Sequence, residues 1–168
     1  MFHIYCGEGK GKTTSAVGLA IRAVGAGKKV YFFQFLKNGS SSEISVLRKI
    51  DGIDVKCCEV CSKFTFQMTE EEKRSVYDFH NSMLEEAKYL STDENILIVL
   101  DELCGAYNSG LVEKSLAENT VFGSRAEIVI TGRNPDDKFL SCADYVSEIK
   151  AVRHPYTKGV TARKGIEY

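Results

Sequence analysis

The architecture of this chain follows from one stretch near its start, Cys6-Gly7-Glu8-Gly9-Lys10-Gly11-Lys12-Thr13-Thr14. It lies between a short apolar run, residues 1–5, and a segment at 15–24 whose apolar residues recur at helical spacing. A glycine-rich turn between a strand and a helix suits phosphate, because loop N–H groups and the helix dipole converge on the anion. The sequence therefore predicts a nucleotide site at this turn.

The glycine-rich loop, residues 7–13, departs from the usual phosphate-binding pattern at one position. The pattern G-x-x-x-x-G-K-[ST] requires glycine at position 6, where this chain has Cys6. Gly7 and Gly9 supply the flexibility instead, so the first turn is shifted by one residue. We expect Lys12 to reach the terminal phosphates and the Thr13 hydroxyl to ligate Mg²⁺. The alternative, a glycine-rich turn with an incidental lysine, fits the Gly-Lys-Thr-Thr sequence at a strand-to-helix junction poorly.

Length and composition narrow the class of protein. A chain of 168 residues, 43% hydrophobic and 27% charged, predicts one globular domain over residues 1–168. The net charge of −1 provides no field that would attract nucleic acid or an acidic membrane. We find no signal-peptide pattern, and the longest aliphatic run, 96–100, is too short to span a bilayer. We therefore expect a cytoplasmic protein without a nucleic-acid or membrane partner.

The six cysteines raise the question of metal or redox chemistry. Cys58-Glu59-Val60-Cys61 has the C-x-x-C spacing of zinc and redox motifs. A structural zinc site needs a second pair of ligands at matching spacing, and none follows in the sequence. We therefore expect free thiols in a reducing cytosol, with a metal or redox role as the alternative.

Strand and helix patterns alternate along the rest of the chain. Apolar runs predict strands at 29–35, 53–57, 95–102, 127–133 and 144–149. Helices are predicted at 40–50, opened by a capping box of Ser40 and Glu43, at 69–90, opened by Thr69 and Glu72, and at 111–119. This alternation predicts a three-layer α/β fold of the P-loop NTPase-like (RecA-like) class, with a mainly parallel sheet flanked by helices.

Charged residues follow several of the predicted strands. Asp101 and Glu102 end one strand, where a phosphate-loop fold places a carboxylate that organises magnesium. Which of the two acids approaches the metal stays open, and the alternative is an acidic strand end that faces water. Lys37 and Arg133 follow two other strands. Because ligands bind outside the carboxyl ends of parallel strands, we expect the loop and these side chains to converge on one rim.

The residues alone leave three classes of function: a hydrolase or motor, a group-transfer enzyme, and a nucleotide-gated binding module.

Beyond the residues themselves, the chain resembles the ATP:corrinoid adenosyltransferases of the cobalamin-synthesis type. The matching segments occur in the same order from residue 5 to the C-terminus. The matching segments are Gly7-Glu8-Gly9-Lys10-Gly11-Lys12-Thr13-Thr14, Gln34-Phe35-Leu36-Lys37, Phe64-Thr65-Phe66, Leu100-Asp101-Glu102-Leu103, Ile130-Thr131-Gly132-Arg133, Ala143-Asp144-Tyr145-Val146-Ser147-Glu148, Arg153-His154-Pro155-Tyr156, Lys158-Gly159-Val160 and Gly165-Ile166-Glu167-Tyr168.

The resemblance implies transfer of the 5′-deoxyadenosyl group of ATP to the cobalt(I) of a reduced corrinoid, with release of triphosphate. It implies nucleotide contacts from Gly7, Glu8, Gly9, Lys10, Gly11, Lys12, Thr13, Thr14 and Lys37. Lys12 and Arg133 would act on the leaving triphosphate, which in this family lies reversed relative to ordinary phosphate-loop ATPases. Thr13, Asp101 and Glu102 would hold Mg²⁺ or Mn²⁺.

The resemblance also implies a corrinoid-binding segment and partners. Phe64 and Phe66 would pack on the face of the corrinoid and favour a cobalt without its lower ligand. Phe66 stands where the family commonly has tryptophan, so we expect the role to persist with altered affinity. The chain also lacks the N-terminal extension that helps cover the active site in some members, and His154 is interpreted as structural. Homodimers and an electron-donating flavoprotein are implied as partners.

Two points stay open from the sequence. The acceptor is either complete cobalamin or a precursor such as cobyrinic acid a,c-diamide. The alternative functions are an ATPase or small-molecule kinase of the same fold, for which Glu102 is a candidate base, and a non-catalytic carrier of nucleotide or corrinoid. Triphosphate as product would indicate the transferase, ADP the ATPase or kinase, and neither the carrier.

Overall fold

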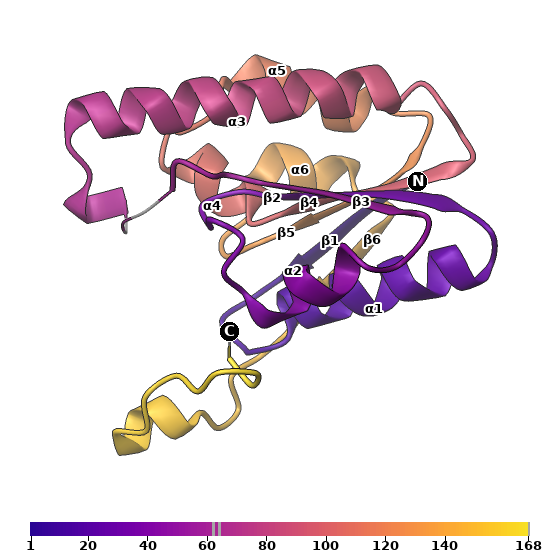
Figure 1. Ribbon diagram of the computed structural model, residues 1–168. Coiled ribbons are helices and arrows are strands. Elements are labelled where there is room, and N and C mark those ends of the chain that lie inside the picture. Colours follow the sequence, from indigo (N-terminus) through magenta and orange to yellow (C-terminus); the bar gives the residue numbers. More distant parts are fainter. Residues whose placement is uncertain (62, 64, 168) are drawn as a thin grey trace.

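The computed structural model describes residues 1–61, 63 and 65–167, and its centre is a parallel β-sheet (Figure 1). Six strands lie in the order β3-β2-β4-β5-β1-β6, and each neighbouring pair is parallel. Their bounds are Phe2–Cys6 (β1), Lys29–Gln34 (β2), Ile53–Cys57 (β3), Ile96–Asp101 (β4), Glu127–Thr131 (β5) and Tyr145–Glu148 (β6). The predicted parallel sheet is confirmed.

Helices cover both faces of this sheet (Figure 1). One face carries α1 (Lys12–Gly25) and α2 (Ser42–Leu47). The other carries α3 (Glu70–Leu90), α4 (Leu103–Asn108), α5 (Lys114–Phe122) and α6 (Asp137–Cys142). Two short 3₁₀ turns, η1 (Thr65–Gln67) and η2 (Pro155–Lys158), lie in the connecting segments. The result is the predicted three-layer α/β fold.

The core is divided between the two faces because side chains alternate along each buried strand. In β4, Leu97 and Val99 pack toward α1 and α2, whereas Ile98 and Leu100 pack toward the other four helices. All four residues are buried, which explains why this strand reads as a continuous apolar run. The carboxyl end of β4 is thereby fixed between two packed layers.

The predicted helix boundaries hold where a local signal is strong. The first helix ends at Gly25, and Gly27 beyond it has φ +84°, as expected of glycine near a helix end. Helix α3 begins after Thr69, whose side chain accepts the N–H of Glu72 while the Glu72 carboxylate accepts the N–H of Thr69. The predicted capping box at this position is confirmed.

Other boundaries were predicted incorrectly. The helix expected at 40–50 is shorter, 42–47, and its N-cap is Ser41 rather than Ser40. The Ser40 N–H is bonded to the Asn38 side chain at 3.2 Å, which holds Ser40 in the preceding turn. The helix expected at 111–119 begins instead at Lys114, because the Glu113 carboxylate accepts the first free N–H groups.

Among the described residues, none of the helices combines the length and apolar character needed to cross a bilayer. The longest, α3, has one buried stripe formed by Val76, His80, Met83, Leu84 and Ala87. Its remaining surface carries many charged side chains, as expected for a helix that packs on a sheet and faces water on its other side.

We predict that Thr69→Ala lowers the free energy of unfolding by about 1 kcal/mol, because the N-cap bond to α3 is lost. Ser40→Ala is the matched control, since the structure gives Ser40 no capping role; it should change stability by less than about 0.5 kcal/mol. Urea denaturation followed by circular dichroism measures both variants. Equal losses would contradict the assignment of the caps.

Candidate functional site

A cavity of about 1070 Å³ lies at the carboxyl ends of the strands. It is larger than most pockets for one small ligand, which occupy roughly 300–1,000 Å³. The cavity is lined by the glycine-rich loop, the ends of β2, β4 and β5, the segment before α3 and the C-terminal tail. The lining residues include Glu8, Gly9, Lys10, Gly11, Lys12, Thr13, Thr14, Lys37, Lys63, Gln67, Glu102, Arg133, His154 and Glu167. The structure thus brings together the loop, Lys37, Glu102 and Arg133, as the sequence predicted.

The glycine-rich loop curls around the ammonium group of Lys12. Lys12 Nζ donates to the carbonyl oxygens of Gly7 at 2.8 Å and Gly9 at 2.9 Å. Burial lowers the pKa of Lys12, and the neighbouring Arg133 charge lowers it further. Gly11 precedes helix α1 and has no side chain to cap it, so the first N–H groups of the helix are left for an anion.

Gly7 and Gly9 are required because the loop packs against the residue that follows β6. The Gly9 N–H donates to the Ile149 carbonyl at 2.7 Å, and a Cβ on Gly9 would lie 2.7 Å from that same oxygen. A Cβ on Gly7 would lie 2.5 Å from it, and Gly7 also has φ +101°. The first turn of the loop is therefore fixed by its contact with the backbone of Ile149, which is distant in the sequence.

Asp101 is the buried centre of the site. Its carboxylate is completely buried at the end of β4. Three uncharged side chains donate to it: Thr13 at 2.8 Å, Thr131 at 2.7 Å and Gln34 at 3.1 Å. Because these residues come from α1, β5 and β2, one carboxylate joins the ends of three other elements.

Lys37 and Glu102 lie between this buried centre and the cavity. Lys37 Nζ is 3.5 Å from Asp101 and 3.6 Å from the Glu102 carboxylate. Burial lowers the pKa of Lys37, but the carboxylates of Asp101, Glu102 and Glu43 outweigh burial, and the net pKa is raised. Lys37 is therefore a charged ammonium group at the floor of the cavity.

The two acids at the end of β4 face different surroundings. Glu102 lines the cavity and its side chain is 26% exposed, whereas the Asp101 carboxylate contacts Thr13 inside the protein. Glu102 has φ +64°, and its N–H donates to the Thr131 hydroxyl at 2.9 Å. A left-handed backbone is unfavourable for glutamate, and such strain is concentrated at functional sites. Thr13, Asp101 and Glu102 together offer the oxygen ligands that Mg²⁺ prefers.

Arg133 reaches the rim of the cavity from the end of β5. Its Nε lies 3.3 Å from the carboxylate of Glu8, and both side chains are largely exposed. An exposed ion pair of this kind contributes little stability. Arg133 is therefore free to exchange this contact for an anionic ligand in the cavity.

The aromatic segment lies only partly within the described residues. Phe64, predicted to contact a corrinoid, lies outside them. Phe66 belongs to η1 and is 83% exposed. Its neighbours Lys63 and Gln67 line the cavity. Phe66 is therefore followed directly by a residue of the cavity that the glycine-rich loop also lines.

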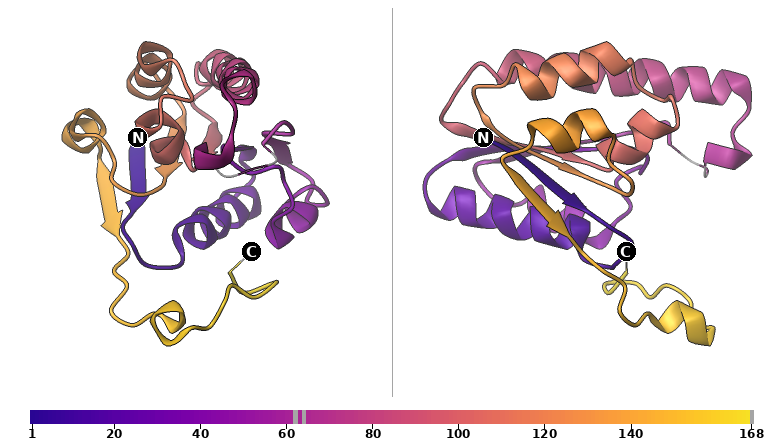
Figure 2. Two further views of the ribbon diagram at one scale, coloured as in Figure 1. Left: turned by 90° about the vertical axis from the view of Figure 1, so that its left-hand side faces the viewer. Right: turned by 180° about the vertical axis from the view of Figure 1, so that it is seen from behind.

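The C-terminal tail forms part of the cavity wall. Figure 2 shows this segment, coloured yellow, on the side of the sheet that carries α1. His154, Gly165, Ile166 and Glu167 line the cavity. His154 Nδ1 accepts the N–H of Tyr156 at 3.2 Å and so caps η2, in agreement with its interpretation as structural.

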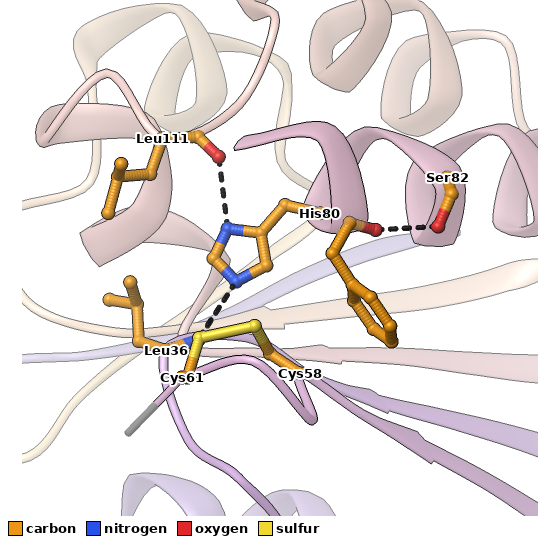
Figure 3. Close-up of a disulfide and its surroundings, with 7 residues drawn as sticks. Leu36, Cys58, Cys61, His80, Ser82 and Leu111 are labelled. Atoms are coloured by element: carbon orange, nitrogen blue, oxygen red, sulfur yellow. Dashed lines mark hydrogen bonds between the residues drawn. A yellow bond between two sulfur atoms is a disulfide. The ribbon is translucent and has the colours of Figure 1, made fainter. Parts of the chain in front are cut away.

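The expectation of free thiols at Cys58 and Cys61 is wrong, because a disulfide joins these two residues (Figure 3). Next to it lies His80 of α3, with Nε2 3.7 Å from the sulfur of Cys61. Sequence spacing did not reveal this neighbour, since His80 is 19 residues from Cys61 and reaches it only by packing of α3. Cys6, Cys57, Cys104 and Cys142 are free, as expected.

Comparison with known proteins gives one consistent result. The sequence model of the family described as ATP:corrinoid adenosyltransferase BtuR/CobO/CobP matches residues 1–168. The corrinoid adenosyltransferase of Pseudomonas aeruginosa is 30% identical over 98% of this chain and 82% of its own length. The corrinoid adenosyltransferase of Escherichia coli and that named CobA in Salmonella typhimurium are each 32% identical, over 98% of this chain and 84% of theirs.

We predict that Gly9→Ala lowers the free energy of unfolding by about 1–3 kcal/mol, because its Cβ would overlap the Ile149 carbonyl. Gly18→Ala is the matched control: nothing lies within 4 Å of its Cβ position, and alanine in a helix should raise stability by about 0.5–1 kcal/mol. Urea denaturation measures both variants. A neutral Gly9→Ala would show that the loop does not depend on this contact.

His80 should make the stability of the protein depend on pH. Burial lowers the pKa of His80 from its ordinary 6.5 to about 4. The unfolded chain therefore takes up a proton below about pH 6.5 while the folded chain does not, so stability present above 6.5 is lost as the pH falls. Between pH 7 and pH 5, under non-reducing conditions, this group should remove about 2 kcal/mol.

The measurement is the free energy of unfolding in urea at several pH values, compared with that of His80→Asn. The wild-type curve should fall more steeply between pH 7 and pH 5. Parallel curves for the two proteins would show that His80 titrates normally in the folded state.

Proposed function

Because this chain belongs to the ATP:corrinoid adenosyltransferase family, whose sequence model matches residues 1–168, we propose that it transfers the 5′-deoxyadenosyl group of ATP to the cobalt(I) of a reduced corrinoid and releases triphosphate. The observation that carries the proposal is the shared cavity. The glycine-rich loop lines one part of it, and Lys63 and Gln67, which lie on either side of Phe66 in the sequence, line another. A cavity of about 1070 Å³ has room for two reactants side by side.

The proposed reaction needs alignment of the reactants more than a protein nucleophile. Cobalt(I) attacks the 5′ carbon of ATP with its own electron pair, a cobalt–carbon bond forms, and the bond from that carbon to the triphosphate oxygen breaks. The protein lowers the barrier by holding the reactants in line and by stabilising charge on the leaving group. No serine, cysteine or histidine nucleophile has to act in this step.

The charged residues around the loop suit the departing triphosphate. Lys12 is held at the centre of the loop, and α1 directs its first N–H groups toward the same place. Arg133 stands at the rim and Lys37 at the floor. We assign contacts with the triphosphate to Lys12 and Arg133, and a further nucleotide contact to Lys37.

The residues around Thr13 fit a magnesium ion. The Thr13 hydroxyl donates a hydrogen bond to Asp101 and accepts one from Lys37 at 3.5 Å, which leaves one oxygen lone pair for a cation. Glu102 adds a carboxylate at the cavity. We propose that Thr13 and Glu102 lie nearest the ion and that Asp101 orients Thr13. The ion would supply positive charge that neutralises the triphosphate.

The exposed ring of Phe66 is the observation that supports a corrinoid as the second substrate. An aromatic side chain that is 83% exposed beside a cavity can gain much apolar contact on binding a flat ring system. Whether cobalamin or cobyrinic acid a,c-diamide is the acceptor depends on contacts beyond this ring. We further propose that the protein is a cytoplasmic homodimer that works with an electron-donating flavoprotein.

An ATPase or kinase of the same fold is the competing function, because Glu102 lines the cavity and is a candidate base. The structure places the Glu102 carboxylate 3.6 Å from the Lys37 ammonium group. This contact directs the carboxylate toward a cation, which suits a magnesium ligand better than a general base. We therefore favour the transferase.

The test is an anaerobic reaction of the purified protein with magnesium-ATP and cobalamin that has been reduced chemically to cobalt(I). The expected products are a light-sensitive adenosylated corrinoid and an equal amount of triphosphate. Lys12→Ala should lower the rate by about 100-fold or more, because a group that stabilises the leaving charge is removed. Lys28→Ala, an exposed lysine beyond the far end of α1, should leave the rate unchanged.

The products distinguish the competing functions. ADP and phosphate without an adenosylated corrinoid would overturn the transferase in favour of an ATPase. Binding of nucleotide and corrinoid without any product would favour a carrier. A folded Lys12→Ala variant with full activity would contradict the role assigned to the loop.

A further inference from the structure

Three potential metal ligands meet in the apolar region between β3 and α3. The sulfur atoms of Cys58 and Cys61 and a ring nitrogen of His80 lie within 4.8 Å of one another. All three residues are buried, and Met68, Val76 and Leu111 pack around the cysteines. The proposed transfer reaction uses none of the three. A buried group of this composition therefore calls for a separate explanation.

The backbone around the two cysteines is already arranged as a chelating turn. The Cys58 N–H donates to the carbonyl of Gln34 at 3.1 Å, which fixes the turn to the end of β2. The Cys61 N–H donates to the carbonyl of Cys58 at 3.0 Å and closes the C-x-x-C turn. C-x-x-C is the spacing with which one turn supplies two thiolates to a zinc ion.

His80 presents the correct nitrogen toward the sulfur atoms (Figure 3). Its Nδ1 is 2.9 Å from the Leu111 carbonyl, which can only accept, so Nδ1 carries the proton. Nε2 therefore has a free electron pair, directed at the Leu36 N–H at 3.2 Å and toward Cys61. Metal-binding histidines commonly donate their second N–H to a carbonyl in this way.

The distance from Cys61 to His80 already agrees with a tetrahedral ion, whereas the two sulfur atoms must separate when the disulfide is reduced. A zinc ion bonded to sulfur at about 2.3 Å and to nitrogen at about 2.05 Å would hold these two atoms about 3.6 Å apart. The distance from Cys61 Sγ to His80 Nε2 is 3.7 Å. Two thiolates also balance the charge of a divalent ion, so the complex would be neutral in apolar surroundings. Cys61 lines the large cavity, from which water can complete the coordination.

We propose that Cys58, Cys61 and His80, once the disulfide is reduced, form a binding site for Zn²⁺ or a similar thiophilic divalent ion. Reduction by a dithiol transfers two electrons and two protons to the cystine, which gives two thiols and leaves the reductant as a disulfide. The ion then displaces both thiol protons and takes the Nε2 electron pair from the Leu36 N–H. The ion would tie the segment leading to Phe66 to α3, independently of which reaction the cavity supports.

The test begins with the complete protein, reduced anaerobically by a phosphine and freed of metal with a chelator. Co²⁺ is titrated as a spectroscopic probe, without corrinoid or nucleotide. One ion per chain should bind, with a near-ultraviolet thiolate-to-cobalt band and the visible bands of a tetrahedral ion. Zn²⁺ should displace it. A reduced protein that binds neither ion saturably, or binds them without these bands, overturns the proposal.

Matched cysteine variants locate the ion. Cys58→Ser with Cys61→Ser should weaken binding by about 100-fold or more and abolish the charge-transfer band. Cys57→Ser should leave both unchanged, because Cys57 is an adjacent buried thiol that packs in the other half of the core. Unchanged binding in the double variant overturns the site, since the ion would then be bound elsewhere.

A measurement on the wild-type protein tests the site even if the double variant does not fold. Zn²⁺ should protect Cys58 and Cys61 from alkylation, as read by mass spectrometry of peptides, while the exposed Cys142 reacts as before. Equal alkylation of Cys58 and Cys61 with and without Zn²⁺ overturns the proposal and leaves a simple dithiol–disulfide pair.

Discussion

The candidate site depends on one buried carboxylate. Asp101 is completely buried, and burying a charge is costly unless hydrogen bonds and opposite charge compensate for it. Thr13, Gln34 and Thr131 supply the hydrogen bonds, and Lys37 supplies the charge. The glycine-rich loop, β2 and β5 must therefore end at the same place as β4. The rim on which a ligand would bind is held in position by this requirement.

Local sequence signals predicted much of this arrangement. Buried parallel strands read as continuous apolar runs, and the glycine-rich loop marks the first strand-to-helix junction, so the sheet and α1 could be derived from the sequence alone. The rule that ligands bind at the carboxyl ends of strands then brought Lys37, Glu102 and Arg133 together, and the structure confirms that they line one cavity. Asp101 is buried and Glu102 faces the cavity because the backbone of Glu102 is left-handed, a feature that no sequence pattern predicts.

The features that the sequence missed are those that depend on short elements or distant contacts. Helices α4 and α6 have six residues each, too few to show a helical period. Ser40 satisfied the capping pattern, but Asn38 binds its N–H and moves the helix start to Ser42. Likewise, Gly9 meets Ile149 only because β6 lies beside β1. Such competing contacts exist only once the chain has folded.

Contacts hold both parts of the cavity in place, and this suits the proposed reaction. The loop side is fixed by the Asp101 hydrogen bonds and by backbone contact with Ile149, as stabilisation of a leaving group requires. The Phe66 side belongs to a short turn between β3 and α3, anchored at its start by Cys58, Cys61 and His80. A firm anchor at the start of that turn limits where the exposed ring can lie. Both reactants of the proposed transfer would therefore meet a surface whose position is restricted, as the alignment of two reactants requires.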